Sequence, residues 1–318
     1  MTVMDRVRTA PQQDGGRADG PAGAPARRAR TGAAGLGVLL ALVATVVWSG
    51  SFVAARGLHD SVPPVQAAFW RWLIALAAVA PFAARHAWRE RAALRAHLGY
   101  VTLAALLGVT VYNTLVNQAG LTTSAANMGM IMAASPVVMA LFSRLGGERL
   151  GARRTTGLLV AAGGVLFLVG GGAAGTGLAT GDLWMFGAAL AFASYSALLR
   201  RKPAELGGPA FLFATFLIGA LLLAPAYAAS LALQGGFAAA PGTVGPLCYV
   251  GVLSSALAFF AWNKAVSLIG AARAGAVYYL QPVCVVLLSF ALLGETTDAR
   301  QLLCMGLILG GVILGARK

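Results

Sequence analysis

The chain has 318 residues, of which 58% are hydrophobic and only 11% charged, whereas about 25% of the residues of a soluble domain are charged. This composition excludes an ordinary soluble domain and predicts a polytopic membrane protein. The formal net charge of +14 would suit a nucleic-acid binder, but the basic residues gather in the connectors between apolar segments, which is typical of membrane orientation. We therefore expect the lipid bilayer, and no nucleic acid, as a partner.

Residues 1–31 are rich in Ala, Gly, Pro and Arg and contain almost no large apolar residue. Such a composition cannot build a hydrophobic core, so we expect a disordered basic tail. Arg27-Arg28 precede an apolar run, but the next residues do not continue a twin-arginine signal. The first apolar segment also has a copy later in the chain, so we expect it to be retained.

Ten apolar segments follow the tail, each close to the roughly 20 residues that a helix needs to cross a bilayer. We expect an all-α polytopic membrane protein with ten transmembrane helices, near residues 34–57, 65–84, 98–118, 122–143, 153–171, 182–199, 209–232, 245–263, 272–293 and 301–316. If both termini are cytoplasmic, all of the 24 Lys and Arg residues except Arg56, Arg71 and Arg300 fall on the inner side. The positive-inside rule therefore predicts cytoplasmic N- and C-termini.

One half of the chain repeats the other. Asn117-Gln-Ala-Gly and Pro136 recur as Asn263-Lys-Ala-Val and Pro282, at a shift of 146 residues. Other aligned pairs are Pro81 with Pro225 at a shift of 144, and Gly147-Glu148 with Gly294-Glu295 at 147. Because each unit holds five spans, an odd number, the second unit enters the membrane from the opposite side. We expect two five-helix inverted-topology repeats, at residues 32–172 and 180–318.

These motifs resemble the drug/metabolite transporter superfamily in its ten-span, duplicated EamA-type branch. The resemblance covers residues 34–316 and rests on Trp48-Ser-Gly-Ser-Phe52, Phe69-Trp-Arg71, Asn117-Gln-Ala-Gly120, the prolines at 136 and 282, and the two Gly-Glu pairs. It implies an inner-membrane exporter of small metabolites, often amino acids, in a bacterial-type plasma membrane. We expect export of neutral amino acids with apolar or aromatic side chains by alternating access between the repeats, and a multidrug exporter is the alternative.

Pro136 and Pro282 interrupt apolar segments, where each removes a backbone hydrogen bond that hydrocarbon cannot replace. The carbonyls of Met132 and Tyr278, four residues earlier, lose their intrahelical donors. We expect hinges at both prolines, with the freed carbonyls as polar spots for a substrate amine. The alternative is a static kink that a neighbouring Ser or Thr satisfies.

Polar and aromatic residues inside the predicted spans are few, and they would cost free energy if they faced lipid. Arg71 is the single charged residue well inside a span, where it would either hold a substrate carboxylate through a bidentate bond or snorkel outward. Interior polar residues also bond helix to helix, and the methionines suit either a promiscuous pocket or the core. The candidate substrate-binding residues are Trp48, Arg71, Tyr112, Asn113, Met128, Met132, Ser135, Tyr195, Tyr278, Tyr279 and Gln281.

Other functions lack the residues that they need. No Asp, Glu or His lies deep in a predicted span, so we expect facilitated or weakly coupled transport of a neutral or zwitterionic solute rather than cation/proton antiport. An intramembrane serine protease at Ser254 and Ser255 would lack a histidine in a span to activate it, so we expect no enzyme. The inverted repeat with paired prolines favours a carrier over a non-selective channel or a purely structural membrane protein.

The three cysteines, Cys248, Cys284 and Cys304, lie in apolar spans without CxxC or histidine spacing. They predict neither a disulfide frame nor a metal site, and we expect no cofactor. Glycines on the fifth and tenth spans have small-xxx-small spacing, which permits close helix approach within one molecule or between two. A monomer and a homodimer both fit this pattern.

Overall fold

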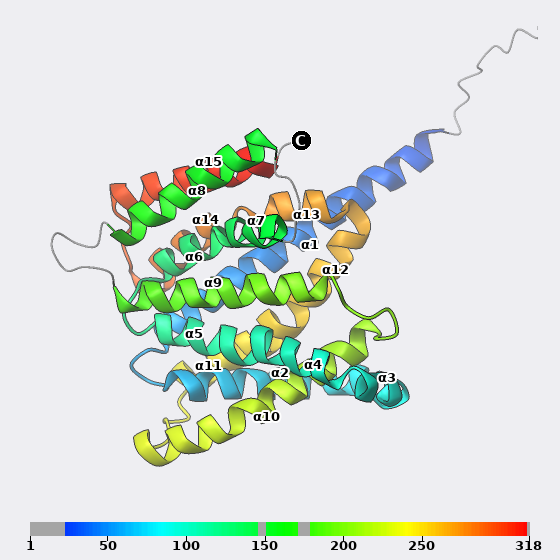
Figure 1. Cartoon of the computed structure of the whole chain (residues 1–318), viewed down its shortest axis with the longest axis vertical. Coiled ribbons are helices and arrows are strands. Elements are labelled where there is room, and N and C mark those ends of the chain that lie inside the picture. The colour runs from blue at the N-terminus through cyan, green and yellow to red at the C-terminus, as the bar shows by residue number, and fades with distance from the viewer. Residues whose placement is uncertain (1–22, 146–150, 171–178, 317–318) are drawn as a thin grey trace, which may run out of the picture.

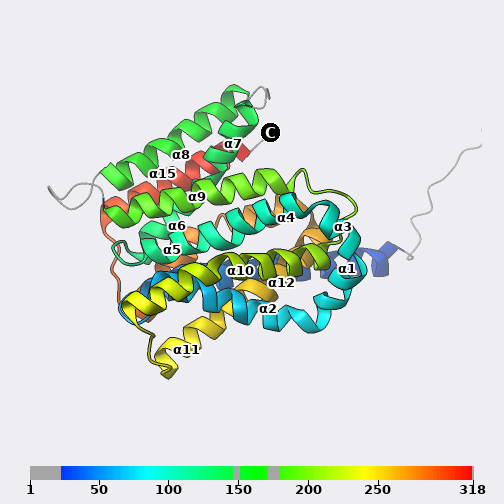
Figure 2. The same cartoon turned by 60° about the horizontal axis from the view of Figure 1, so that its bottom comes forward.

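The computed structural model describes residues 23–145, 151–170 and 179–316. The described residues are almost entirely helical, and the helices lie side by side in one bundle (Figures 1 and 2). Most of the expected basic tail, residues 1–22, and the Gly147-Glu148 pair lie outside the described residues.

The first half of the chain contains the elements α1 to α8 and one π-helical segment, η1. Their bounds are α1 Gly23–Gly57, α2 Pro64–Arg89, α3 Arg91–Ala96, α4 Leu98–Ala105, η1 Leu106–Val111, α5 Tyr112–Ala119, α6 Ala125–Ala133, α7 Ser135–Leu145 and α8 Ala152–Gly170. The second half follows with α9 Thr180–Leu199, α10 Gly208–Gln234, α11 Pro241–Cys248, the π-helical η3 Tyr249–Leu257, α12 Ala258–Ile269, α13 Ala271–Tyr278, α14 Gln281–Leu293 and α15 Ala299–Ala316.

Ten apolar helical stretches match the ten predicted spans in order. Within the described ranges, seven are long and apolar enough to cross a membrane, and the three shorter ones are Ala125–Met139, Thr155–Leu168 and Ala299–Gly315. The shorter three correspond to the fourth, fifth and tenth predicted spans. This pattern confirms an all-α polytopic membrane protein.

The two prolines begin new helices instead of bending continuous ones. The segment 122–143 divides into α6 and α7 at Ala134, and the segment 272–293 divides into α13 and α14 at Tyr279-Leu280. Pro136 and Pro282 therefore lie in the first turns of α7 and α14, where a missing N–H removes no helical bond. Each predicted kink is a helix break, while the hinge role of the prolines stays a prediction.

Both halves also carry a π-helical segment in their third span. At the shift of 146 residues, η1 aligns with residues 252–257, inside η3. In η1, Asn113 Nδ2 donates to the carbonyls of Gly108 and Val109 at 3.2 and 3.1 Å. In η3, Ser255 Oγ donates to Val250 O at 2.8 Å. Side chains thus support the wider turns, which often accompany functional sites.

Helices from equivalent positions in the two halves pack together at opposite edges of the bundle. Figures 1 and 2 show α8 beside α15 at one edge and α2 beside α10 at the other. On α15, a Cβ at Gly311 would meet Gly157 O and Ala161 N, both at 2.5 Å, so the α8 and α15 backbones touch. The predicted close approach of small residues is therefore made within the molecule. Between α2 and α10, the rings of Trp72 and Phe216 lie 4.6 Å apart.

Candidate functional site

An aromatic cluster lies where α1 meets α12 and α13. The Trp48 ring lies 5.3 Å from Phe259, 5.4 Å from Trp262 and 5.8 Å from Tyr278. Its indole nitrogen donates to the Ser254 carbonyl at 3.0 Å, which fixes the ring against η3. The cluster joins an aromatic residue of the first half to three of the second, as expected for a site shared between halves.

Arg71 lies beside this cluster with its guanidinium directed inward. The residue is only 9% exposed, and its Nε and Nη2 donate to the hydroxyls of Ser255 and Ser254 at 3.0 and 3.3 Å. Its burial contradicts the outward snorkelling that was one of our two alternatives. Within the described part of the chain, no carboxylate forms an ion pair with Arg71. A guanidinium has five N–H donors, so it retains capacity for a ligand.

The close approach of η3 to α2 positions the serines for Arg71. Gly251 makes this approach possible, because a Cβ there would lie 2.6 Å from Ile74 Cγ2 and 3.1 Å from the Arg71 carbonyl oxygen. The next helical turn of η3 then carries Ser254 and Ser255 to the guanidinium. A glycine in the second half thus helps to place a charge of the first half.

Three further side chains surround the guanidinium and the aromatic cluster. Tyr112 and Tyr249 lie within electrostatic range of Arg71, and the Tyr249 hydroxyl donates to Val47 O at 2.6 Å. Gln281 is 2% exposed, its side chain lies beside the Tyr278 hydroxyl, and its Oε1 has no hydrogen-bond partner among the described residues. A buried acceptor without a partner is costly, so Gln281 is suited to meet a donor of a bound solute.

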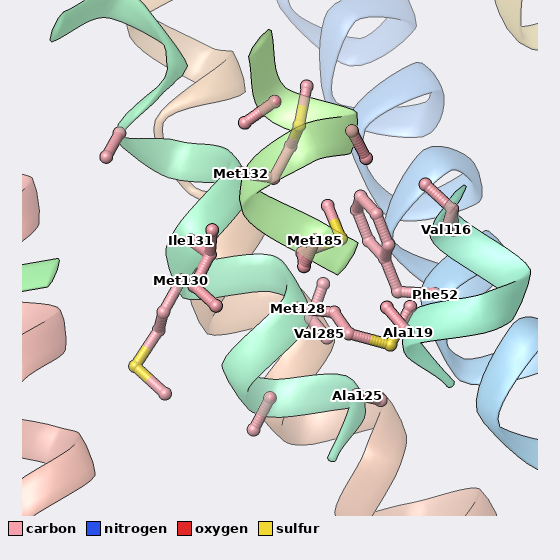
Figure 3. Close-up of a cluster of buried hydrophobic side chains, with 14 of the residues drawn as sticks. Phe52, Val116, Ala119, Ala125, Met128, Met130, Ile131, Met132, Met185 and Val285 are labelled. Carbon is pink, nitrogen blue, oxygen red and sulfur yellow. The ribbon is translucent and has the colours of Figure 1, made fainter. Parts of the chain in front are cut away.

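The structure therefore brings together five of the predicted site residues: Trp48, Arg71, Tyr112, Tyr278 and Gln281. Met128 and Met132 lie instead in the hydrophobic core with Phe52, Met185 and Val285 (Figure 3). Asn113 bonds its own π-helical turn, Tyr195 packs over Gly108, Ser135 is buried, and Tyr279 is half-buried.

Sequence reasoning missed five members of this site: Tyr249, Ser254, Ser255, Phe259 and Trp262. The serines attracted notice only as nucleophiles of a protease, although two adjacent hydroxyls in an apolar span also predict an interior polar contact. Tyr249 is the first residue of the same π-helical segment, and Phe259 lies in α12 just beyond it. The segment itself has no distinct sequence pattern, so its widened turn could not be foreseen.

The repeat does not create a second site of the same chemistry. By the repeat shifts of 144 and 146, Arg71 corresponds to Thr215, and Ser254 and Ser255 correspond to Gly108 and Val109. Thr215 bonds its own helix at Leu212 O, 2.9 Å away. Among the described residues, the bonded guanidinium, the two hydroxyls and the aromatic cluster therefore have no equivalent arrangement in the other half.

A helical bundle with buried polar and aromatic side chains between its two halves is characteristic of a membrane transport protein. The chain belongs to the EamA-like transporter family, whose model matches residues 35–170 and again residues 179–316. The resemblance inferred from the sequence motifs is thereby confirmed.

Curated relatives agree with this family, and a solved structure has a similar fold. The chain is 25% identical over 289 residues to an "Uncharacterized transporter" of Archaeoglobus fulgidus, covering 88% of this chain and 97% of the relative. It is 29% identical over 292 residues to a "Probable terminal-alkyne amino-acid exporter" of Streptantibioticus cattleyicolor, covering 87% and 93%. A crystal structure with 22% identity has a TM-score of 0.56 and covers 87% of this chain and 95% of its own, which supports the fold.

Proposed function

We propose that this transporter exports small amino-acid-type metabolites, with neutral apolar or aromatic side chains, by alternating access between its two halves. The single observation that carries the proposal is Arg71, a buried guanidinium held by two hydroxyls at the meeting of the halves. A buried charge without an oppositely charged partner has a high free-energy cost. An arginine with spare N–H donors therefore favours a solute that brings its own carboxylate.

The surroundings of Arg71 suit the rest of an amino acid. The aromatic cluster of Trp48, Phe259, Trp262 and Tyr278 offers ring faces and edges to an apolar or aromatic side chain. The same rings attract a solute ammonium group, and Gln281 Oε1 can accept a hydrogen bond from it. The relative named as an amino-acid exporter supports the same substrate class.

A multidrug exporter is the second candidate, favoured by the aromatic cluster, which would also hold flat organic cations. The positive charge of Arg71 opposes a cationic drug in the same space. Among the described residues, Asp182 is a buried carboxylate at 4% exposure, but it lies in the first turn of α9 and accepts from Thr123 Oγ1 at 2.5 Å. It does not line the aromatic cluster.

Solute counterflow in proteoliposomes tests the proposal. Vesicles loaded with one unlabelled solute should transiently accumulate the same labelled solute from outside, and L-phenylalanine, L-leucine, L-glutamate and ethidium are the probes. We expect saturable counterflow of the two neutral amino acids. Counterflow of ethidium alone would support the drug exporter, and linear, non-saturable uptake would indicate a channel.

The membrane arrangement is part of the proposal. The charge distribution favours both termini in the cytoplasm of a cell with a bacterial-type inner membrane, so export would run from the α3 side to the side where α1 ends at Gly57. The protein would act as a monomer or homodimer, without a cofactor or metal.

A further inference from the structure

A second arginine of the first half, Arg56, holds a carboxylate of the second half at the C-terminal end of α1. Glu295 lies in the connector between α14 and α15, and its Oε1 accepts from Arg56 Nε at 3.0 Å. Its Oε2 accepts from the backbone N–H of Ala125 at 3.1 Å. The two side chains are only 26% and 19% exposed. By the charge distribution, this end of the bundle is the outer one.

The first half builds this anion site by itself. Ala125 is the first residue of α6, whose Ser124 cap accepts the N–H of Asn127 through its hydroxyl, at 3.2 Å. The N–H of Ala125 is therefore left for an outside acceptor, and the positive end of the helix dipole favours an anion there. Arg56 is held in place because its Nη1 donates to Gly120 O at 2.9 Å.

The turn between α5 and α6 is also packed directly on the end of α1. A Cβ at Gly120 would lie 2.8 Å from the carbonyl oxygen of Ala55, so backbone touches backbone at this point. The guanidinium and the helix end are thus aligned by contacts that do not involve Glu295. Every part of the anion site comes from the first half, and only its occupant comes from the second.

We propose that Arg56 and the amino end of α6 form a carboxylate-binding site that Glu295 masks in this conformation, and that a departing carboxylate solute exchanges with Glu295 there. The exchange rests on the proposed function, because it uses the same solute carboxylate that Arg71 would hold. Arg56 lies eight residues beyond Trp48 on α1, about 12 Å along the helix. Glu295 would close the outer end until a solute replaces it.

Chemical rescue tests the masked site without any transport measurement. Glu295→Ala removes the internal carboxylate and should lower the Tm of the purified full-length protein. Adding sodium acetate should raise the Tm again, while acetamide at the same ionic strength should not, because only acetate supplies a charged acceptor. Asp298→Ala is the matched control, since Asp298 lies in the same connector but its carboxylate accepts from the backbone N–H of Gln301 and not from Arg56; its Tm should not respond to acetate.

The double variant Arg56→Gln/Glu295→Ala should show no acetate-dependent rise in Tm. A rise that persists without Arg56, or no acetate-specific rise in Glu295→Ala, would overturn the site. If Glu295→Ala is recovered only as aggregate, Glu295→Gln keeps the side-chain volume and removes only the charge. Its Tm should fall below that of the parent, and an equal fall in the Arg56→Gln background would overturn the site.

A further comparison addresses the exchange and separates it from the proposed function. In Glu295→Ala, L-phenylalanine should replace acetate in raising the Tm, whereas its methyl ester should not. Acetate rescue without amino-acid counterflow would leave the site standing and contradict the proposed function. Amino-acid counterflow without acetate rescue would contradict the carboxylate site and leave the proposed function standing.

Discussion

Gly311 and Gly310 provide a matched pair for testing the packing of α15 on α8. A Cβ at Gly311 would lie 2.5 Å from Ala161 N and 2.5 Å from Gly157 O, whereas a Cβ at Gly310 meets nothing within 4 Å. Both substitutions to alanine gain the same helix propensity, about 1 kcal/mol. The propensity gain therefore cancels when the two variants are compared.

The difference in unfolding free energy between Gly311→Ala and Gly310→Ala then reports the steric contact alone. The neighbours of Gly311 are backbone atoms, which cannot rotate away, so the helices must separate. We expect Gly311→Ala to be less stable than Gly310→Ala by about 1–3 kcal/mol, the usual cost of overpacking a filled interior. Size-exclusion chromatography of samples heated in detergent gives the Tm of each variant and so shows which of the two is less stable.

The equivalent pair on α8 refines this test. A Cβ at Gly164 would lie 2.9 Å from Ile308 Cγ1, a side-chain atom that can move, and Gly163 again has nothing within 4 Å. Gly164→Ala should therefore cost less than Gly311→Ala. Equal stability of the Gly310 and Gly311 variants, or a lower stability of the Gly310 variant, would refute the packing described here.

Three further substitutions test the site and its supports. Trp48→Ala removes three ring contacts and the donor to Ser254 O, so amino-acid counterflow should fall at least tenfold, with Trp48→Phe intermediate; an unchanged rate would exclude the cluster from the site. Gly251→Ala forces η3 away from Ile74, so the solute concentration that gives half-maximal counterflow should rise. A saturation curve separates this rise from a lower maximal rate caused by reduced expression, and an unchanged half-saturating concentration would contradict the role of Gly251. Asn113→Leu leaves two carbonyls of η1 without their side-chain donor, and a loss of about 1–3 kcal/mol in stability is expected; a Tm at or above that of the parent would contradict this role.

The number and order of the spans could be predicted because both depend on composition and length, which are local properties. Trp48, Arg71 and Tyr278 could also be identified, because polar and aromatic residues inside apolar segments must find interior partners. Their partners could not, since Arg71 bonds Ser255, which is 184 residues away. The contact of Arg56 with Glu295 spans 239 residues, and single residues at connector ends carry no pairing signal.

The helix breaks and the π-helical segments were harder to predict for a different reason. A proline within an apolar run fits either a kink or a new helix, and only the neighbouring turn decides between them. At Pro136 and Pro282, that turn ends the preceding helix. The methionines of α6 illustrate the same limit, because the stripe that would line a pocket equally fills a core.

The most direct test of the account is whether Arg71 recognises the solute carboxylate. Counterflow of L-phenylalanine and of its methyl ester should be compared in the parent protein, in Arg71→Gln, and in Arg85→Gln, which changes an exposed arginine near the end of α2. The account predicts that the parent and Arg85→Gln carry L-phenylalanine at least tenfold faster than the ester, and that Arg71→Gln loses L-phenylalanine counterflow. Equal rates for the two solutes, or full activity of Arg71→Gln, would contradict it.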